Sequence, residues 1–376
     1  MKRTIFEEEH LIFRNAFKQF VNEEVVPYSA QWIKNGIVDR RIWEKAGDSG
    51  FLAPFVDEKY GGLGLKDFRY SMIMIEELAY VGESGFILSL HNDVIAPYID
   101  SYGCDEQKQR WLPRIVSGEA ILAIAMTEPG TGSDLQNIKT RLEDKGDHYI
   151  LNGSKTFISN GILSDIVVVA ANIEGAGLTL CVVERGVEGF SRGANLEKMG
   201  MKSQDTAELF FENVIVPKSD ILGNPGQGFI YLMQKLAQER ITCAIGSIAS
   251  AQYALDQTLA YVQERKAFGK PIGKFQNTRF KMAEMKTEIT IGQTFVDTLV
   301  ANHLKGEVTP DEACMAKYWA SDLLNKVAYE CVQLHGGYGF MMEYPIARIY
   351  TDARITTIFA GTNEIMKEVI GRSMGL

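Results

Sequence analysis

The sequence lacks the features that mark several large classes of protein. Its five cysteines, an odd number among 376 residues, are scattered without Cys-x-x-Cys spacing, which argues against a disulfide framework and a zinc site. It contains no run of eighteen apolar residues, so we expect no membrane-spanning helix. Internal repeats and low-complexity tracts are also absent. A folded protein of a reducing compartment fits these absences.

Positive charge is also scarce. The 39 lysines and arginines are outnumbered by 48 acidic residues, which gives a formal net charge of -9. Because nucleic acids and anionic membranes attract basic surfaces, we expect neither as a partner, and a few local cations must bind any anionic ligand. The acidic start, MKRTIFEEEH, does not resemble a signal peptide, and the closing Met374-Gly375-Leu376 is not a peroxisomal signal.

What is present is a globular composition, with 46% hydrophobic and 23% charged residues. Apolar residues at three- and four-residue spacing predict a helical domain over residues 1–119. Short β-rich segments separated by Gly, Asn and Asp predict a small β domain over residues 120–226. Helical periodicity returns over residues 227–376 and predicts long helices. The expected fold class is therefore α+β, with three parts packed into one subunit.

The β domain carries a glycine-rich turn with several hydroxyl groups, AMTEPGTGSD at residues 125–134. Such a turn exposes backbone N–H groups that can hold a planar heterocycle or a carbonyl group, although most glycine-rich turns are only turns. The later string NGSKTFISNG, residues 152–161, places Phe157 and Ser159 on one strand. They could form a wall and a hydrogen-bonding edge for a flat cofactor, but a strand phenylalanine more often packs in the core.

Two further strings stand in the C-terminal part. The basic loop RKAFGKPIGKFQ, residues 265–276, could bind an anion through the planar fork of Arg265, or could simply oppose a helix dipole. The string QLHGGYGF, residues 333–340, places His335 beside two glycines. No second ligand-spaced histidine or cysteine accompanies His335, so we expect no metal site and interpret this residue as structural.

Together these strings resemble the acyl-CoA dehydrogenase family, over essentially the whole chain and most closely its long-chain members, through MAKYWASDL, CVQLHGGYGF and GTNEIMKEVI. The resemblance implies the family's fold: a helical N-terminal domain, a small central β domain and a C-terminal four-helix bundle. It also implies FAD as cofactor, an acyl-CoA as substrate and electron-transferring flavoprotein as electron acceptor. A homotetramer, built as a dimer of dimers, is expected because the family's counterpart of residues 265–276 holds the FAD of a neighbouring subunit.

The resemblance also assigns site residues. The flavin contacts that it implies are Met126, Thr127, Ser133, Phe157, Ser159, Arg265, Phe268, Gln276, Gln333, Gly337, Thr362 and Glu364. The substrate contacts that it implies are Ser133, Arg240 and Gly361. Thr362 is at the same time a plausible helix N-cap. Thr131 stands where the family usually has a smaller residue, and Phe157 where tryptophan is common, which bears on the packing around the flavin ring.

The catalytic base is not where most of the family has it. The usual Tyr-Glu-Gly-Thr string reads Phe359-Ala360-Gly361-Thr362, so the glutamate is replaced by Ala360. The resemblance still implies that the backbone N–H of Ala360 helps to polarise the thioester carbonyl. A minority of the family, including isovaleryl and long-chain members, carries its base on a helix of the C-terminal domain. The matching string here, LAQER, gives Glu239 as the catalytic base.

The helical pattern supports Glu239 independently. Glu239 lies seven residues after Leu232 on an apolar stripe, and Gly246 and Ser250 follow on the same face. Most glutamates are solvated, whereas a carboxylate that faces inward beside small residues is a candidate site. Burial would raise its pKa and Arg240 would oppose that rise, so the sequence leaves the net direction open.

The implied reaction removes the α-proton of an acyl-CoA while the β-hydrogen leaves as hydride to the flavin, which yields a trans-2-enoyl-CoA. A long-chain fatty acyl-CoA of β-oxidation is the expected substrate. The alternatives are a branched acyl-CoA of the isovaleryl or citronellyl type, an acyl-CoA oxidase, and a homologue that binds flavin or acyl-CoA without catalysis. The expected location is the bacterial cytoplasm, or the mitochondrial matrix for a mature eukaryotic chain.

Overall fold

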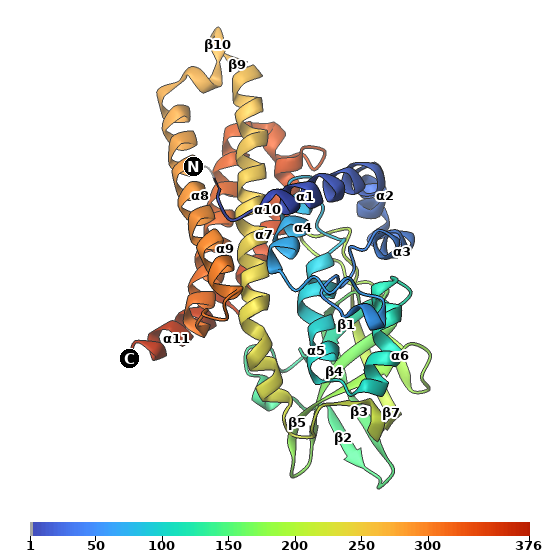
Figure 1. Ribbon diagram of the computed structural model, residues 1–376. Coiled ribbons are helices and arrows are strands. Elements are labelled where there is room, and N and C mark those ends of the chain that lie inside the picture. Colours follow the sequence, from blue (N-terminus) through green and yellow to red (C-terminus); the bar gives the residue numbers. More distant parts are fainter. Residues whose placement is uncertain (1–2) are drawn as a thin grey trace.

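The computed structural model describes residues 3–376, which run from helices through a sheet to helices again (Figure 1). The first helices are α1 (Glu8–Phe20), α2 (Val26–Asn35), α3 (Arg41–Asp48), α4 (Phe68–Ala79), α5 (Ala96–Tyr102) and α6 (Asp105–Val116). Two π-helical turns, Val21–Val25 and Leu90–Ile95, lead directly into α2 and α5. Each stands before a first turn that contains a proline, whose missing N–H removes an α-helical hydrogen bond and permits the wider turn.

The middle of the chain forms a mixed sheet. Its strands are β1 (Leu122–Ala125), β2 (Arg141–Asp144), β3 (His148–Ser159), β4 (Ile166–Ile173), β5 (Gly177–Glu184), β6 (Phe190–Arg192), β7 (Thr206–Pro217) and β8 (Ile221–Leu222). They are ordered β6-β7-β3-β2-β4-β5-β8, with β1 also paired to β4. Strands β1 and β2 run parallel to β4, and the remaining neighbours are antiparallel.

Strand β4 is buried on both faces. Ile166 and Val168 pack against the N-terminal helices with Trp111, while Val167 and Val169 pack inside the β domain. Alternate side chains of a strand point to opposite faces, so the continuous apolar string of β4 supplies two cores at once.

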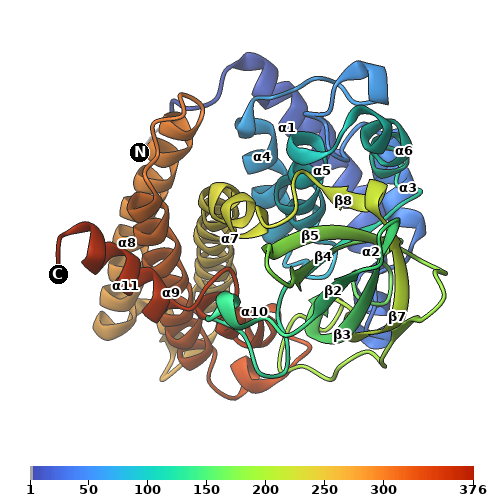
Figure 2. The same ribbon diagram turned by 90° about the horizontal axis from the view of Figure 1, so that it is seen from below.

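The C-terminal part consists of long helices and a small hairpin. They are α7 (Gly228–Glu264), β9 (Lys266–Ala267), β10 (Lys270–Pro271), α8 (Gln276–His303), α9 (Pro310–His335), α10 (Pro345–Ala353) and α11 (Asn363–Ser373). Helix α7 runs between the other C-terminal helices on one side and the N-terminal helices and sheet on the other (Figures 1 and 2). It is therefore in contact with all three parts, including α4, α9 and β5. The predicted α+β fold class is confirmed.

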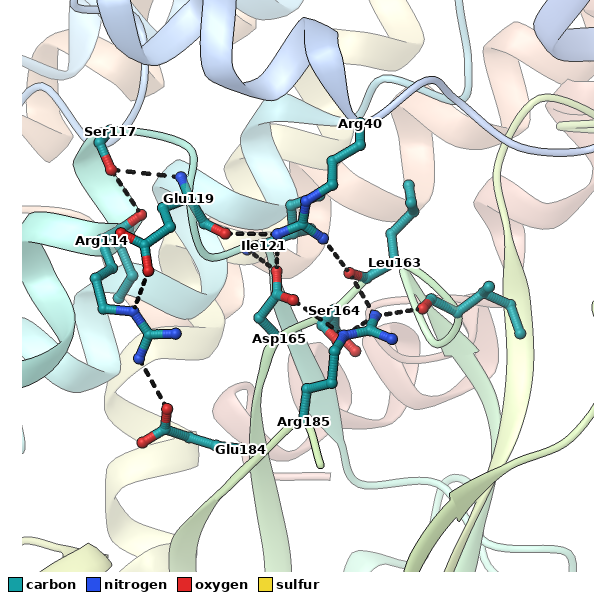
Figure 3. A network of polar contacts seen from close by, with 12 residues as sticks. Arg40, Arg114, Ser117, Glu119, Ile121, Leu163, Ser164, Asp165, Glu184 and Arg185 are labelled. Atoms are coloured by element: carbon teal, nitrogen blue, oxygen red, sulfur yellow. Dashed lines mark hydrogen bonds and ion pairs between the residues drawn. The ribbon is translucent and has the colours of Figure 1, made fainter. Parts of the chain in front are cut away.

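A polar network fastens the N-terminal helices to the sheet (Figure 3). Buried Asp165, one residue before β4, accepts hydrogen bonds from Arg40 at 2.6 Å, from Nε of Arg185 at 3.0 Å and from the Ile121 N–H at 2.9 Å. A single exposed ion pair contributes little to stability. Here one buried carboxylate satisfies three donors from three segments, which fixes the start of α3 relative to β1 and β4.

Candidate active site

A cavity of about 370 Å³ lies where the three parts of the chain meet. Its wall combines side chains from α4 and the segment after it, from the ends of β1 and β3, from one face of α7, and from residues 349–360. Six of the predicted site residues line this single cavity: Met126, Thr127, Phe157, Ser159, Glu239 and Ala360. The fold thus brings together residues that the sequence separates by more than two hundred positions.

Glu239 projects from α7 into this cavity. Its side chain is half-buried only because it borders the cavity, and its Oε2 atom has no hydrogen-bond partner among the described residues. Burial raises the pKa of the carboxyl group to about 7, although the charges of Arg240 and Lys317 oppose the rise. The direction that the sequence left open is thereby decided, because desolvation outweighs the two cations. Gly246 and Ser250 line the same cavity, as the helical period predicted.

The turn around Ala360 is conformationally strained. Ala360 has a φ of +54° and Gly361 a φ of +87°, and the left-handed region is unfavourable for a residue with a Cβ. Lys317 of α9 holds this turn, because its Nζ donates to the Gly361 carbonyl at 2.7 Å and to Asn363 Oδ1 at 2.9 Å. Thr362 caps α11 by accepting the Ile365 N–H at 3.3 Å, so its predicted N-cap role is confirmed.

Sequence reasoning missed Lys317. Its signal was present in and around the string MAKYWASDL, where a lysine stands four residues after Ala313, three before Ala320 and seven before Leu324 on the buried face of a helix. Burying a lysine on such a face costs free energy, because its charge must be desolvated. A lysine there therefore usually has a specific structural or functional role.

Phe157 is not a core residue. A bulge between Lys155 and Ile158 interrupts the pairing of β3 with β7, and Phe157 adopts a φ of +58° and is 69% exposed. The side chain thus leaves the sheet and forms part of the cavity wall, so the interpretation of Phe157 as a core residue is wrong. Its ring is largely uncovered by other protein atoms, and Thr127 and Ser159 line the same cavity. The ring could therefore stack on a flat aromatic ligand.

A buried ion pair stands behind this wall and was also missed. Lys155 is fully buried and its Nζ donates to Glu128 at 2.9 Å and to the Met126 carbonyl at 3.0 Å. Glu128 in turn accepts the N–H groups of Lys139 and Thr140. The glycine-rich turn is therefore tied from within to β3, and the strings at 125–134 and 152–161 form one structural unit.

A second group of predicted residues gathers at another surface. Arg265, Gln333 and Gly337 line one hollow beside Tyr338, and this hollow shares no lining residue with the cavity of Glu239. Phe268, at the tip of the β9–β10 hairpin, is 95% exposed, and this hairpin projects from the end of the molecule remote from the sheet (Figure 1). Gln276 opens α8 after the same loop.

The remaining predicted flavin and substrate contacts lie outside both hollows. Ser133 and Glu364 are exposed, and buried Arg240 donates from Nη1 to Cys314 Sγ at 3.2 Å. His335 lines the hollow of Arg265, where it is bonded through Nδ1 to the Cys331 carbonyl at 2.8 Å and stacks on Tyr261, in keeping with its structural interpretation.

Within residues 3–376 no three or more His, Cys, Asp or Glu side chains gather as metal ligands would. None of the helices in the same range combines the length and apolar character that a bilayer crossing requires.

The cavity contains the two groups needed to remove a proton from a carbon next to a carbonyl group. A carboxyl group with a pKa near neutrality can act as a general base at physiological pH. A backbone N–H in a fixed turn can stabilise negative charge that develops on an oxygen. Both line a largely apolar space, where such interactions are stronger than in water.

Comparison with known proteins gives matches over almost the entire chain. Family models described as the N-terminal, middle and C-terminal domains of acyl-CoA dehydrogenase match residues 7–119, 123–214 and 226–375. The mitochondrial long-chain specific acyl-CoA dehydrogenase of Rattus norvegicus is 49% identical, over 99% of this chain and 88% of that protein. The mitochondrial isovaleryl-CoA dehydrogenase of Solanum tuberosum is 33% identical, over 98% and 91%.

Solved structures agree with these sequence matches. The crystal structure of an acyl-CoA dehydrogenase from Geobacillus kaustophilus superposes with a TM-score of 0.97 at 50% identity and covers 100% of both chains. Other solved relatives, which match over at least 98% of this chain, were determined in complex with FAD or FADH2.

Proposed function

The chain belongs to the acyl-CoA dehydrogenase family, and from this premise we propose that it oxidises long-chain acyl-CoA thioesters with Glu239 as the catalytic base. It is an oxidoreductase whose cofactor is FAD. We propose further that the electrons pass to electron-transferring flavoprotein. The proposed location is the bacterial cytoplasm, with the mitochondrial matrix as the alternative; acyl-CoA dehydrogenases among the relatives come from both bacteria and mitochondria.

The residues present fit the cofactor. Phe157, turned out of its strand, supplies a wall, and Thr127 and Ser159 would supply hydrogen bonds at the edge of a flat ring. Arg265, Gln333 and Gly337 would bind the dinucleotide part of FAD in a neighbouring subunit. When bound, FAD supplies the acceptor for the β-hydrogen, which leaves as hydride.

The chain's own residues would carry the proton transfer. The ionised form of Glu239 takes the α-proton, and its unpartnered Oε2 leaves it free to do so. The N–H of Ala360 would bind the thioester oxygen as negative charge develops there. The apolar cavity excludes water, which strengthens both interactions.

The length of the cavity along α7 supports a long acyl chain. Its lining includes Glu239, Cys243, Gly246 and Ser250, which succeed one another on one face of the helix. The eleven residue steps from Glu239 to Ser250 rise by about 16 Å, enough for roughly a dozen carbons joined by single bonds in a zigzag. Small side chains at Gly246 and Ser250 leave this path open.

A branched acyl-CoA is the second candidate, because the isovaleryl-CoA dehydrogenase relative covers the chain as fully as the long-chain one. The two are separated by measuring flavin reduction with straight acyl-CoAs of increasing length and with branched ones. In a protein that binds acyl-CoA without catalysis, neither the straight nor the branched acyl-CoAs would bleach the flavin. Reoxidation by oxygen instead of electron-transferring flavoprotein would indicate an oxidase.

Substitution of Glu239 by glutamine tests the proposed base. The amide keeps the shape of the side chain but cannot accept the proton. We expect Glu239→Gln to retain FAD and to lose flavin reduction by a long-chain acyl-CoA by at least about a thousandfold, the usual scale for a general base combined with its positioning. The measurement is anaerobic stopped-flow absorbance of the flavin after mixing with substrate.

The matched control is Glu174→Gln, in the exposed turn between β4 and β5, which should behave as the wild type. Flavin reduction at a near-normal rate in Glu239→Gln would remove the assignment. Absence of reduction in the wild-type protein itself, across the whole substrate panel, would instead refute the proposed dehydrogenation.

A further inference from the structure

Lys317 is a fully buried cation for which residues 3–376 provide no ion-pair partner. Its Nζ contacts a carbonyl and an amide oxygen, but no carboxylate. The other fully buried lysine, Lys155, shows the usual solution, because it pairs with Glu128 at 2.9 Å. A buried charge without a counter-charge is costly to keep. Such a charge is expected where negative charge appears during function.

The two contacts of Lys317 are themselves held in place. Asn363 donates from Nδ2 to Asp322 Oδ1 at 2.8 Å, which turns its Oδ1 toward Lys317. The second contact is the carbonyl of Gly361, the residue directly after Ala360. The ammonium group therefore holds the C-terminal side of the turn that presents the Ala360 N–H. One of its three N–H donors is left for a further acceptor.

Only a few groups near Glu239 carry a charge that could influence its ionisation. The titratable or charged groups that interact with Glu239 or Lys317 are Tyr98 of α5, Arg240 and Cys243 of α7, Cys314 and Asp322 of α9 and Glu364 of α11. Burial raises the pKa values of Tyr98, Cys243 and Cys314, which keeps all three neutral. Asp322 is engaged by Asn363 and Glu364 is exposed. Arg240 and Lys317 are therefore the charges that favour an ionised Glu239.

We propose that Lys317 is a positioning residue of the active site, which fixes the Ala360–Gly361 turn and places a positive charge that favours the carboxylate form of Glu239. This inference rests on the proposed function. Lysine fits this position better than a second arginine would, because its compact ammonium group can donate hydrogen bonds to two oxygens beside one turn.

Two variants separate the two roles. Lys317→Met removes the charge and the donors, whereas Lys317→Gln removes the charge and keeps an NH2 group for the turn. The rate of flavin reduction by a long-chain acyl-CoA is measured from pH 5.5 to pH 9. Loss of the charge should raise the pKa of Glu239, so the rising limb of the profile should move upward by about one pH unit in both variants, a tenfold loss of rate below the midpoint.

The second readout is the infrared carbonyl band of a bound trans-2-enoyl-CoA, which reports the hydrogen bond from Ala360 without turnover. It should return toward the frequency of the free thioester in Lys317→Met and stay near the wild-type value in Lys317→Gln. FAD content and thermal stability show whether each variant is folded. If Lys317→Met does not fold, Lys317→Gln decides the proposal through its pH profile alone.

The matched control is Lys326→Gln on the same helix, which removes an exposed lysine paired with Glu288 and should leave both readouts unchanged. Wild-type pH profiles and carbonyl bands in the folded Lys317 variants would overturn the inference. That result differs from a failure of the proposed function, in which wild-type flavin is not reduced by any acyl-CoA.

Discussion

At the scale of single residues, Glu239 shows how a site is built at the expense of stability. Its pKa of about 7 lies far above the ordinary value of 4.5 for a glutamate, because the cavity desolvates it. The folded protein therefore holds a proton on Glu239 more tightly than the unfolded chain does. Between about pH 4.5 and pH 7 the stability of the folded state falls as pH rises, and the loss is complete above pH 7.

The pH dependence of stability follows from this shift. Glu239→Gln removes the ionisable group, so we expect the variant to unfold at a higher temperature than the wild type at pH 8. The corresponding gain in the free energy of unfolding should be up to about 3 kcal/mol at pH 8 and should shrink toward pH 5. Thermal unfolding of the two FAD-loaded proteins at pH 5 and pH 8 measures this difference.

The exposed Glu174→Gln variant provides the baseline for this comparison and should show no such pH-dependent gain. A difference between Glu239→Gln and the wild type that is the same at both pH values would contradict the raised pKa, since only the titration of Glu239 ties the gain to pH.

At the scale of elements, α7 combines two tasks on one face. Its upstream positions carry the base, and its downstream positions leave space beside α4, where an ideal Cβ on Gly246 would lie 3.5 Å from Ile75 Cγ2. A single methyl group fits at that distance, but the two γ carbons of valine would enter the cavity. Gly246 thus lies on the proposed path of the acyl chain.

Gly246→Val should restrict the enzyme to shorter acyl chains. We expect kcat/KM for long straight acyl-CoAs to fall at least about tenfold, which corresponds to roughly 1.4 kcal/mol of lost binding in the transition state, while short acyl-CoAs are oxidised as before. A kinetic profile over chain length measures the effect. Ala260→Val, at an exposed position of the same helix, is the control. An unchanged chain-length profile in Gly246→Val would mean that the chain takes another path.

At the scale of the whole molecule, the β9–β10 hairpin is the surface that we expect to contact a neighbouring subunit. Its two-residue tip is Phe268-Gly269, both with positive φ, where asparagine-glycine would be the locally favoured pair. Phe268 is 95% exposed and conformationally strained, and within its own chain its ring meets only Phe275 among the described aromatic residues, edge-on at a centroid distance of 6.1 Å. We propose that it packs against a neighbouring subunit, beside the FAD that Arg265 and Gln333 help to bind, in a homotetramer.

Phe268→Asp tests this association. A charged tip should weaken the contact, so we expect sedimentation velocity to show smaller assemblies that depend on concentration, with about a tenfold or greater fall in the affinity for FAD as the shared site is lost. Ile215→Asp, on the exposed side of β7, is the control for a new surface charge. Wild-type assembly and FAD content in Phe268→Asp would show that the hairpin is not part of the interface.

The sequence by itself determined what depends on local periods. The helical spacing placed Glu239, Gly246 and Ser250 on one face of α7, because the period of a helix is set by its backbone geometry. The β-rich segments between Gly, Asn and Asp located the strands β1, β3, β4, β5 and β7. The sequence pattern missed β2, β6, β8 and the β9–β10 hairpin, which have two to four residues per strand and lack the run of apolar β-forming residues that marks β1 and the longer strands. The two π-helical turns were also not predicted.

Only the tertiary structure decided the properties that arise between distant segments. Lys317 reaches Gly361 because α9 packs beside the last turn, and the pKa of Glu239 rises because three parts of the chain together remove its water. Phe157 faces outward because a bulge in β3, set by its pairing with β7, turns it from the core. Desolvation and side-chain contact depend on the surrounding volume, which a one-dimensional pattern does not contain.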